Sequence, residues 1–343
     1  MEVIILKDKE AVSKKAARII RNQVNNKSNS VLGLATGSTP IGIYENLVRY
    51  YQEEKVDFRN VITFNLDEYV GLDPKNENSY ISFMKHHLFN HVNISDYNIN
   101  IPSGLSEDFE AEAMEYERKI ASFGGVDIQL LGIGHNGHIG FNEPGSNFKL
   151  HTHVINLNDK TIEANKRFFD SIDDVPKQAV TMGIKTIFSA RKILLVALGE
   201  GKKEAVNRLL NEEISPDLQA SILHLHPDVT ILLDVAAASG ITSEKILDQT
   251  NVIETQLNCL VTSEVGLHSL PASQLASVFS EYDGEIKIVF NHQELNAKDF
   301  MNIIKLGIKK DEKFKLKLLG TNNKELISEL NRLSSEQKII KVL

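Results

Sequence analysis

The sequence predicts an α/β protein, with a doubly wound, mainly parallel sheet followed by a small C-terminal α+β open-faced sandwich. Three observations indicate this. Apolar runs of strand length recur between residues 31 and 234, and each ends in a turn rich in Gly or small polar residues. Helical patterns separate these runs. After residue 251 the order of strands and helices changes, which indicates a second, smaller unit.

The main domain is predicted from these apolar runs and the segments between them. The runs are almost continuously apolar, which is typical of strands buried on both faces and hence of a parallel sheet. The predicted strands are 31–35, 61–65, 126–133, 192–198 and 229–234. The predicted helices include 10–24, 42–51, 109–123 and 202–210. In doubly wound folds ligands bind at the carboxyl ends of the strands, so we expect the site there.

The C-terminal unit is predicted from a shorter alternation of patterns. Its elements are a strand at 252–262, a helix at 271–281, strands at 285–290 and 293–296, a short helix after Asp299, a strand at 313–319 and a helix at 323–333. A chain of 343 residues is too long for one core. We therefore expect domains at 1–238 and 252–343, joined by a linker at 239–251.

Charge and composition exclude several classes of protein. The net charge is −8, and residues 251–343 hold twelve basic and twelve acidic residues, so the acidic excess lies in residues 1–250. An acidic body argues against nucleic-acid binding. No apolar run reaches the roughly 20 residues of a membrane helix, and charges at 7–10 interrupt any secretory signal. Cys259 is the only cysteine, which excludes an internal disulfide. We expect a cytoplasmic protein with no membrane contact.

A first candidate binding motif follows the strand at 31–35. It consists of Thr36, Gly37, Ser38, Thr39 and Pro40. Small residues let backbone N–H groups approach an anion, hydroxyls add donors, and the following helix start adds partial positive charge. The alternative is a tight turn in which Thr39 caps the helix and Pro40 is its first residue. Both interpretations remain open from these residues alone.

Two adjacent carboxylates, Asp67 and Glu68, follow the strand at 61–65. A carboxylate at a ligand crevice can remove a proton from carbon if its surroundings keep its pKa near the working pH. The alternative is a solvated turn before Gly71. The position at a strand end favours the functional interpretation.

The densest motif is the glycine-rich loop at 132–144, which contains Asn136, His138, Asn142 and Glu143. Its glycines leave the backbone free to wrap a ligand, and a histidine transfers protons near neutral pH. We interpret His135 as a loop residue. A core role for His138 alone would leave its polar neighbours unexplained, so the loop predicts catalysis.

Two cations complete the candidate site. Lys202 begins the helix at 202–210, and Arg167 lies in the stretch NKRFFD. Each is more often a surface charge when seen singly, but a phosphate ligand would require cations in an acidic body. The histidines His86, His87, His224 and His226 lack partner ligands, so we predict no metal site.

In this order the motifs make residues 1 to about 238 resemble the glucosamine-6-phosphate deaminase family. The matching stretches read LGLATGSTP, TFNLDEYVGL, GIGHNGHIGFNEPG, NKRFFD, VPKQAVTMGI and LHLHP. The resemblance implies conversion of D-glucosamine 6-phosphate and water to D-fructose 6-phosphate and ammonia, without cofactor. It further implies that His138, supported by Glu143 and Asn136, opens the sugar ring.

The resemblance also assigns the remaining site residues. Asp67 would move a proton from C2 to C1, and residues 36–39, Arg167 and Lys202 would hold the phosphate. Some family members have Asp where this chain has Asn136, which implies an orienting role here. Allosteric members of the family bind an activator phosphate through basic residues just after the glycine-rich loop. The corresponding stretch here, residues 150–155, contains His151 and His153 but no Arg or Lys.

Residues from about 252 onward resemble the phosphocarrier HPr of the sugar phosphotransferase system, which makes the C-terminal unit an HPr-like open-faced sandwich. The matching stretches are GLHSLPA, NAK and LGI. His268 is the candidate phosphoacceptor, with a capping role as the alternative. The family motif has Arg where this chain has Leu270, and regulated members have a phosphorylatable Ser where it has Asp299. Both departures favour a regulatory role.

Three function classes remain after this comparison. The deaminase is favoured, and the alternatives are a sugar-phosphate lactone hydrolase and a non-catalytic sugar-phosphate sensor. The predicted partners are a small-molecule sugar phosphate and, through the HPr-like domain, proteins of the phosphotransferase system. No nucleic acid or membrane is expected, and a homo-oligomer is compatible with the sequence.

Overall fold

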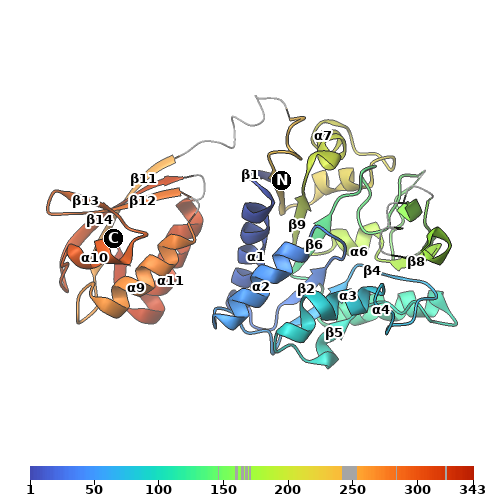
Figure 1. Ribbon diagram of the computed structural model, residues 1–343, viewed down its shortest axis with the longest axis horizontal. Helices are drawn as coiled ribbons and strands as arrows, with labels where there is room; N and C mark the ends of the chain where they lie inside the picture. Colours follow the sequence, from blue (N-terminus) through green and yellow to red (C-terminus); the bar gives the residue numbers. More distant parts are fainter. Residues whose placement is uncertain are drawn as a thin grey trace. The chain divides into compact units, whose positions relative to one another are not determined.

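The computed structural model describes residues 1–145, 147–158, 161–163, 166, 169, 171–241, 253–282, 284–320 and 323–343. The chain divides into two compact units, Met1–Ile241 and Thr242–Leu343 (Figure 1). We refer to the first unit as the body.

The body is built on a seven-stranded sheet in which every strand pairing is parallel. The strand order is β1-β10-β9-β6-β2-β3-β5. The strands are β1 Glu2–Leu6, β2 Val31–Leu34, β3 Ile62–Asn65, β5 Ile99–Asn100, β6 Ile128–Gly132, β9 Lys192–Ala197 and β10 Val229–Asp234. The predicted doubly wound fold is confirmed. Strands β1 and β5 add to the five strands expected from the sequence.

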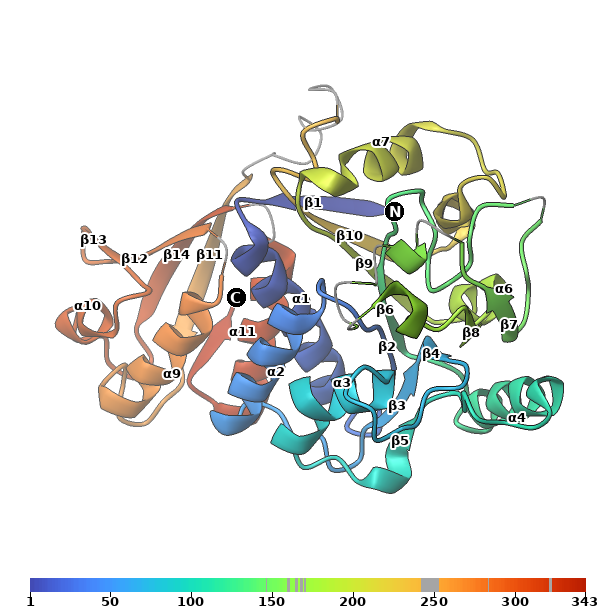
Figure 2. The ribbon, with the colours of Figure 1, turned by 45° about the vertical axis from the view of Figure 1, so that its right-hand side comes forward.

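Among the described residues the longer helices of the body are α1 Lys9–Asn26, α2 Ile41–Gln52, α3 Tyr80–His87, α4 Phe109–Ser122, α6 Ile184–Phe188 and α7 Lys203–Asn211. From β2 the chain moves outward through β3 to β5, then returns through β6 and β9 to β10. Right-handed crossovers therefore put α1, α2 and α3 on one face and α4, α6 and α7 on the other (Figure 2). The direction reverses between β2 and β6, and this is the expected place for a ligand.

A second, three-stranded antiparallel sheet lies at the carboxyl end of β3. Its order is β4-β8-β7, with β4 Asp67–Tyr69, β7 His153–Asn156 and β8 Gln178–Thr181. Asp67 pairs with Thr181, and a small apolar core of Tyr69, Phe141, Leu157 and Ala179 packs beside the sheet. This sheet holds Asp67, the second residue after β3, in a defined position.

In its described part the C-terminal unit has a five-stranded antiparallel sheet in the order β13-β12-β14-β11-β15 and three helices. The elements are β11 Ile253–Val261, α9 Ser269–Ser280, β12 Gly284–Phe290, β13 Gln293–Asn296, α10 Phe300–Lys305, β14 Lys313–Gly320, α11 Asn323–Gln337 and β15 Ile340–Val342. Along β14 buried and exposed residues alternate, and the buried ones join a core with the helices. The predicted α+β sandwich is confirmed.

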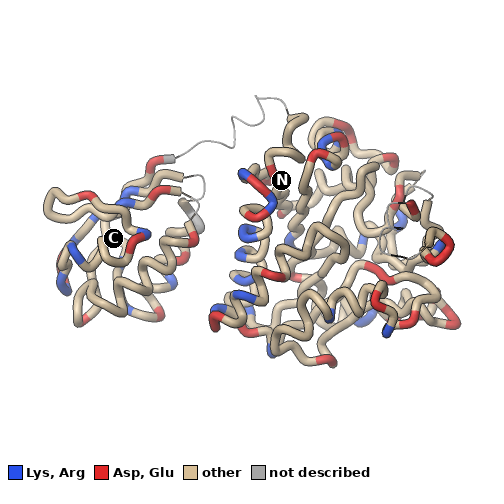
Figure 3. The backbone as a smooth tube through the Cα atoms, in the orientation of Figure 1, with Lys and Arg blue, Asp and Glu red and all other residues tan. Residues whose placement is uncertain are grey.

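Basic residues are concentrated on two elements, α1 and β14. Lys and Arg residues recur along α1 (Figure 3), and lysines stand at every second position from Lys313 to Lys317 in β14. Within the described part of the chain, no helix combines the length and apolar character needed to cross a membrane.

Candidate active site

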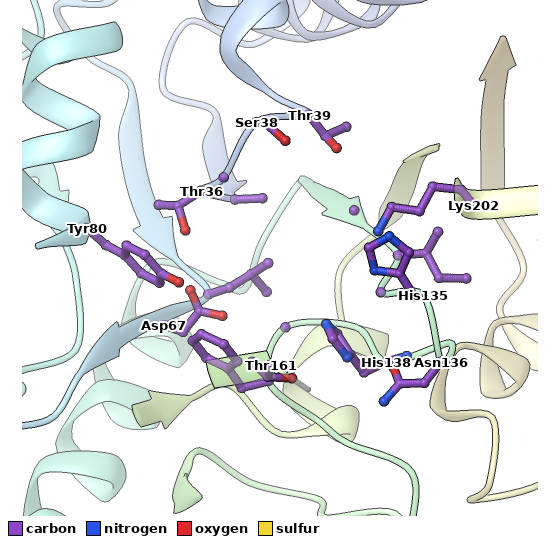
Figure 4. Close-up of a pocket in the computed structure, with 18 residues that line it drawn as sticks. Thr36, Ser38, Thr39, Asp67, Tyr80, His135, Asn136, His138, Thr161 and Lys202 are labelled. Atoms are coloured by element: carbon purple, nitrogen blue, oxygen red, sulfur yellow. Dashed lines mark hydrogen bonds between the residues drawn. The ribbon is translucent and has the colours of Figure 1, made fainter. Parts of the chain in front are cut away.

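A cavity of about 250 Å³ opens at the reversal point of the main sheet (Figure 4). It lies where β2, β3 and β6 end, so segments far apart in the sequence meet there. Its walls are formed by Ala35, Thr36, Gly37, Ser38, Thr39, Leu66, Asp67, Tyr80, Gly132, Ile133, Gly134, His135, Asn136, His138, Gly140, Phe141, Thr161 and Lys202.

The turn at 36–39 joins β2 to α2 at the upper wall of the cavity. The residue before α2 is Pro40, and no side chain caps this helix, so the alternative in which Thr39 serves as its cap is wrong. Gly37 has φ +94, a left-handed conformation, and nothing lies within 4 Å of a Cβ added there. The turn therefore offers hydroxyl and backbone donors beside an uncapped helix start, the arrangement that suits an anion.

Asp67 and Glu68 have separate surroundings although they are adjacent. The Glu68 carboxylate accepts hydrogen bonds from the backbone N–H groups of Tyr69 at 2.8 Å, Tyr80 at 2.9 Å and Ile81 at 3.1 Å. Two of these donors belong to the first turn of α3, so Glu68 has a structural role at that helix start. Of the two carboxylates, Asp67 lines the cavity.

The Asp67 carboxyl is held in a dry environment. Asp67 is 6% exposed. Burial raises the pKa of Asp67 to about 8, and the negative charge of Glu68 adds to the rise. Tyr80 lies across from this carboxyl (Figure 4), and burial raises the pKa of its phenol well above the ordinary value. A carboxyl with a pKa near neutral pH is suited to accept and return a proton.

His138 and Glu143 form a pair within the glycine-rich loop. His138 Nδ1 lies 3.3 Å from Glu143 Oε2, although the geometry falls short of a full hydrogen bond. Asn136 Nδ2 donates to the same Glu143 oxygen at 2.7 Å, and Asn136 Oδ1 accepts from the His138 backbone N–H at 3.2 Å. Asn136 thus links the two members of the pair, and its orienting role stays a prediction.

The glycine at 134 makes room for the imidazole. A Cβ added to Gly134 would overlap three atoms of the His138 ring. The ring therefore lies directly against the loop backbone, and the absence of a side chain at this position sets where the imidazole can stand.

Lys202 reaches the cavity from the turn after β9. Gly199 begins this turn with φ +82, and its N–H donates to both Asp234 carboxylate oxygens, at 3.0 and 2.9 Å. The first oxygen also accepts from the Ala237 N–H at 2.7 Å. Asp234, at the end of β10, therefore braces the turn that carries Lys202, a role that the sequence did not reveal.

The structure brings most of the predicted site residues together. Those that line the cavity are Thr36, Gly37, Ser38, Thr39, Asp67, Asn136, His138 and Lys202. Glu143 stands behind this wall and contacts His138. Arg167 lies outside the described residues. His135, interpreted as a loop residue, also lines the cavity. No group of three or more His, Cys, Asp or Glu able to hold a metal occurs within the described residues.

Sequence reasoning missed two polar residues of the cavity, Tyr80 and Thr161. Tyr80 begins α3 after a polar stretch, and Thr161 follows one, so neither stands in a recognisable motif. Phe141 also lines the cavity, but it belongs to the glycine-rich loop at 132–144, which the sequence analysis had identified.

Residues 7–231 match the family model described as glucosamine-6-phosphate isomerases/6-phosphogluconolactonase. The chain belongs to this family. Residues 256–336 match a second model, described as the PTS HPr component phosphorylation site. Both matches confirm the resemblances inferred from the motifs.

Curated members of the glucosamine-6-phosphate isomerase/6-phosphogluconolactonase family match the body over nearly their whole length. A glucosamine-6-phosphate deaminase of Thermoanaerobacter pseudethanolicus is 51% identical over 246 residues, covering 72% of this chain and 97% of the relative. One of Clostridium botulinum (strain Loch Maree) is 54% identical over 239 residues, covering 70% of this chain and 98% of the relative.

Two solved structures are similar to the body. A monomeric glucosamine-6-phosphate deaminase shares 51% identity, with a TM-score of 0.69 over 70% of this chain and 100% of its own. A 6-phosphogluconolactonase from Leishmania guyanensis shares 24% identity, with a TM-score of 0.54 over 71% of this chain and 99% of its own. The second likeness shows the fold alone.

Proposed function

We propose that this chain converts D-glucosamine 6-phosphate and water to D-fructose 6-phosphate and ammonia. The observation that carries the proposal is the composition of one cavity. It combines a buried carboxyl of raised pKa, an imidazole backed by a carboxylate, and an anion-binding turn with a lysine. Relatives named glucosamine-6-phosphate deaminase at 51–54% identity support it.

In this proposal the phosphate group is held at the upper wall. The hydroxyls and backbone N–H groups of residues 36–39 and the uncapped start of α2 face it, and Lys202 supplies positive charge. Arg167, from the family motif, is the proposed third contact. The phosphate thereby orients the sugar carbons towards Asp67 and His138.

The first chemical step is ring opening. His138 transfers the proton of the anomeric hydroxyl to the ring oxygen as the C1–O5 bond breaks, which produces the open-chain aldehyde. Glu143 lies 3.3 Å from the imidazole and stabilises its charged form. Asn136 holds the carboxylate in place through its 2.7 Å hydrogen bond.

The second step moves a proton between carbons. The Asp67 carboxylate accepts the C2 proton, and the C–H electron pair forms the C1–C2 double bond of an enolamine. The π pair of the C1 aldehyde moves to its oxygen, which takes a proton from water. Asp67 then returns the proton to C1, which leaves an imine at C2. Water adds to this imine carbon and ammonia leaves, so the ketone of fructose 6-phosphate remains.

The two alternatives make different predictions. A lactone hydrolase directs water at an acyl carbon and needs no base for a carbon-bound proton, so it would leave the buried Asp67 without a use. A sensor would bind the sugar phosphate without turnover. The test is ammonia release from glucosamine 6-phosphate together with formation of fructose 6-phosphate. Binding without ammonia release, or hydrolysis of 6-phosphogluconolactone alone, would overturn the proposal.

We expect hyperbolic kinetics that N-acetylglucosamine 6-phosphate leaves unchanged. A second cavity, of about 690 Å³, lies between α4 and residues 151–154. Burial lowers the pKa of His153, which favours its neutral form, and Arg118 pairs with Glu115 at 2.5 Å. This cavity thus offers little free positive charge to an activator phosphate. Initial rates with and without the compound check this, and sigmoidal kinetics relieved by it would contradict it.

We further propose that the C-terminal unit has a regulatory role through contact with proteins of the phosphotransferase system. His268 is exposed at the start of α9, in an extended conformation and without a side-chain cap bond. Asp299 caps α10 by accepting from the Met301 N–H at 2.9 Å. A comparison of kcat and KM between the full chain and residues 1–241 tests this role, and identical constants with and without such partner proteins would count against it.

Leu270 is expected to limit phosphotransfer to His268. Its side chain is 67% exposed where the HPr motif has Arg, so a bidentate phosphate partner is missing. With enzyme I and phosphoenolpyruvate, we expect Leu270→Arg to raise the rate of His268 phosphorylation about tenfold or more. His268→Ala is the control that must abolish labelling. Equal rates in the native chain and the Arg variant would contradict the prediction.

A further inference from the structure

Thr161 lies outside the glycine-rich loop at 132–144 and contacts it through Glu143. Its hydroxyl donates to Glu143 Oε1 at 2.5 Å, and the residue is 8% exposed. Its own backbone N–H donates to Asn158 Oδ1 at 2.8 Å, which anchors the segment on which it stands. Thr161 also lines the cavity (Figure 4).

The two oxygens of Glu143 have different partners. Oε1 accepts from Thr161, whereas Oε2 accepts from Asn136 at 2.7 Å and faces His138 at 3.3 Å. A carboxylate held by a donor on each oxygen cannot rotate without losing a hydrogen bond. The Thr161 hydroxyl therefore fixes which oxygen is presented to the imidazole.

The same contacts keep Glu143 ionised. Burial alone would raise its pKa, but the His138 ring and the hydroxyl and amide donors of Thr161 and Asn136 outweigh burial, so the pKa of Glu143 falls to about 2. Removal of one of these donors shifts the balance back towards the protonated acid. A protonated Glu143 would no longer stabilise a charged imidazole.

We propose that Thr161 is a positioning residue for the ring-opening step: its hydroxyl holds Glu143 so that Oε2 faces His138. The inference rests on the proposed deaminase function. Thr161 acts by positioning Glu143, and this role is distinct from the proton transfers assigned to Asp67 and His138. A substitution here should therefore change kcat more than KM.

The test is Thr161→Val, which keeps the shape of the side chain and removes the donor. We expect kcat to fall about 10- to 100-fold, because a hydrogen bond to a partly buried charged group is lost, and KM to change less than about threefold. Thr161→Ser restores the donor and should recover most of kcat. In Thr161→Val the pKa of Glu143 rises from about 2 towards its ordinary 4.5, so the acid limb of kcat/KM moves to higher pH.

Thr152→Val is a matched control. The Thr152 hydroxyl donates to Glu117 Oε1 at 2.7 Å, and the residue is 5% exposed, but it stands outside the active-site cavity. We expect this variant to lower Tm without moving kcat or the acid limb. A Thr161→Val enzyme with native kcat and pH profile, or a Ser variant no better than Val, would overturn the inference. An unsubstituted chain that releases no ammonia would instead reject the proposed function.

Discussion

Asp67→Asn is expected to lower kcat for ammonia release by about 10²- to 10⁴-fold, the usual contribution of a positioned general base. An amide has the shape of the carboxyl but cannot accept the C2 proton at neutral pH. The phosphate contacts at 36–39 and Lys202 stay intact, so the dissociation constant for glucosamine 6-phosphate should change little. Steady-state kinetics and calorimetric binding measure the two quantities separately.

Hydrogen exchange shows whether this loss concerns the proposed step. In D₂O the native enzyme should incorporate solvent deuterium at C1 of fructose 6-phosphate to the extent that the Asp67 proton exchanges with solvent. Asp67→Asn should form this product about 10²- to 10⁴-fold more slowly. Native turnover in Asp67→Asn would assign the base to another residue.

The difference in stability between the native chain and Asp67→Asn should depend on pH in a defined direction. The pKa of Asp67 is about 8 in the folded chain against an ordinary 3.8, so between these values the folded state holds a proton that the unfolded chain has released. The stability contributed by protonated Asp67 is therefore full below pH 3.8 and is lost as the pH rises through 8. Since Asn does not titrate, the Tm of Asp67→Asn relative to the native Tm should rise between pH 5 and 8.5. A difference in Tm that stays constant over this range would contradict the raised pKa.

The second large effect is expected for Gly134→Ala. The added methyl group would overlap the His138 ring, and because the ring is the movable partner, we expect it to swing away from Glu143 with little cost to the fold. Loss of the positioned imidazole should lower kcat about 10²- to 10⁴-fold. Tm should stay within about 4 °C of the native value. Kinetics and thermal unfolding measured on one preparation check both expectations.

Gly145→Ala is the control for this substitution. It lies in the same loop region but outside the cavity, and the nearest atom to an added Cβ is the Glu143 carbonyl oxygen at 3.9 Å. We expect near-native kcat for it. Native activity in Gly134→Ala would mean that the imidazole does not need its observed position. A fall in Tm of tens of degrees would mean that the loop, and not the ring alone, had been displaced.

The sequence predicted the buried strands because a buried strand is itself a run of apolar residues, which is visible within a few consecutive positions. The residues of β2, β6, β9 and β10 are almost continuously apolar, which only a strand covered on both faces explains. In the C-terminal unit, β14 alternates in hydrophobicity and in burial with the same period. The motifs at the strand ends likewise indicated where the site lies.

Short strands whose partners lie far away in the chain were not predictable in this way. Strand β4 has three residues and pairs with β8 more than a hundred positions later, as in Asp67 with Thr181. Strand β5 has two residues, and β1 is an edge strand with partial exposure. Such segments carry too few residues for a periodic pattern, so packing decides their conformation.

The sequence by itself determined the positions of the buried strands along the chain, the expectation of two units and the chemical groups at the strand ends. Only the tertiary structure decided that Asp67 lines the cavity while Glu68 caps α3, and that Thr161 and Asp234 brace Glu143 and the Lys202 turn. Burial leaves a local pattern of apolar residues. The distance between two side chains that are far apart in the sequence depends instead on how the crossover connections pack the strands and helices together. No short stretch of sequence contains that information.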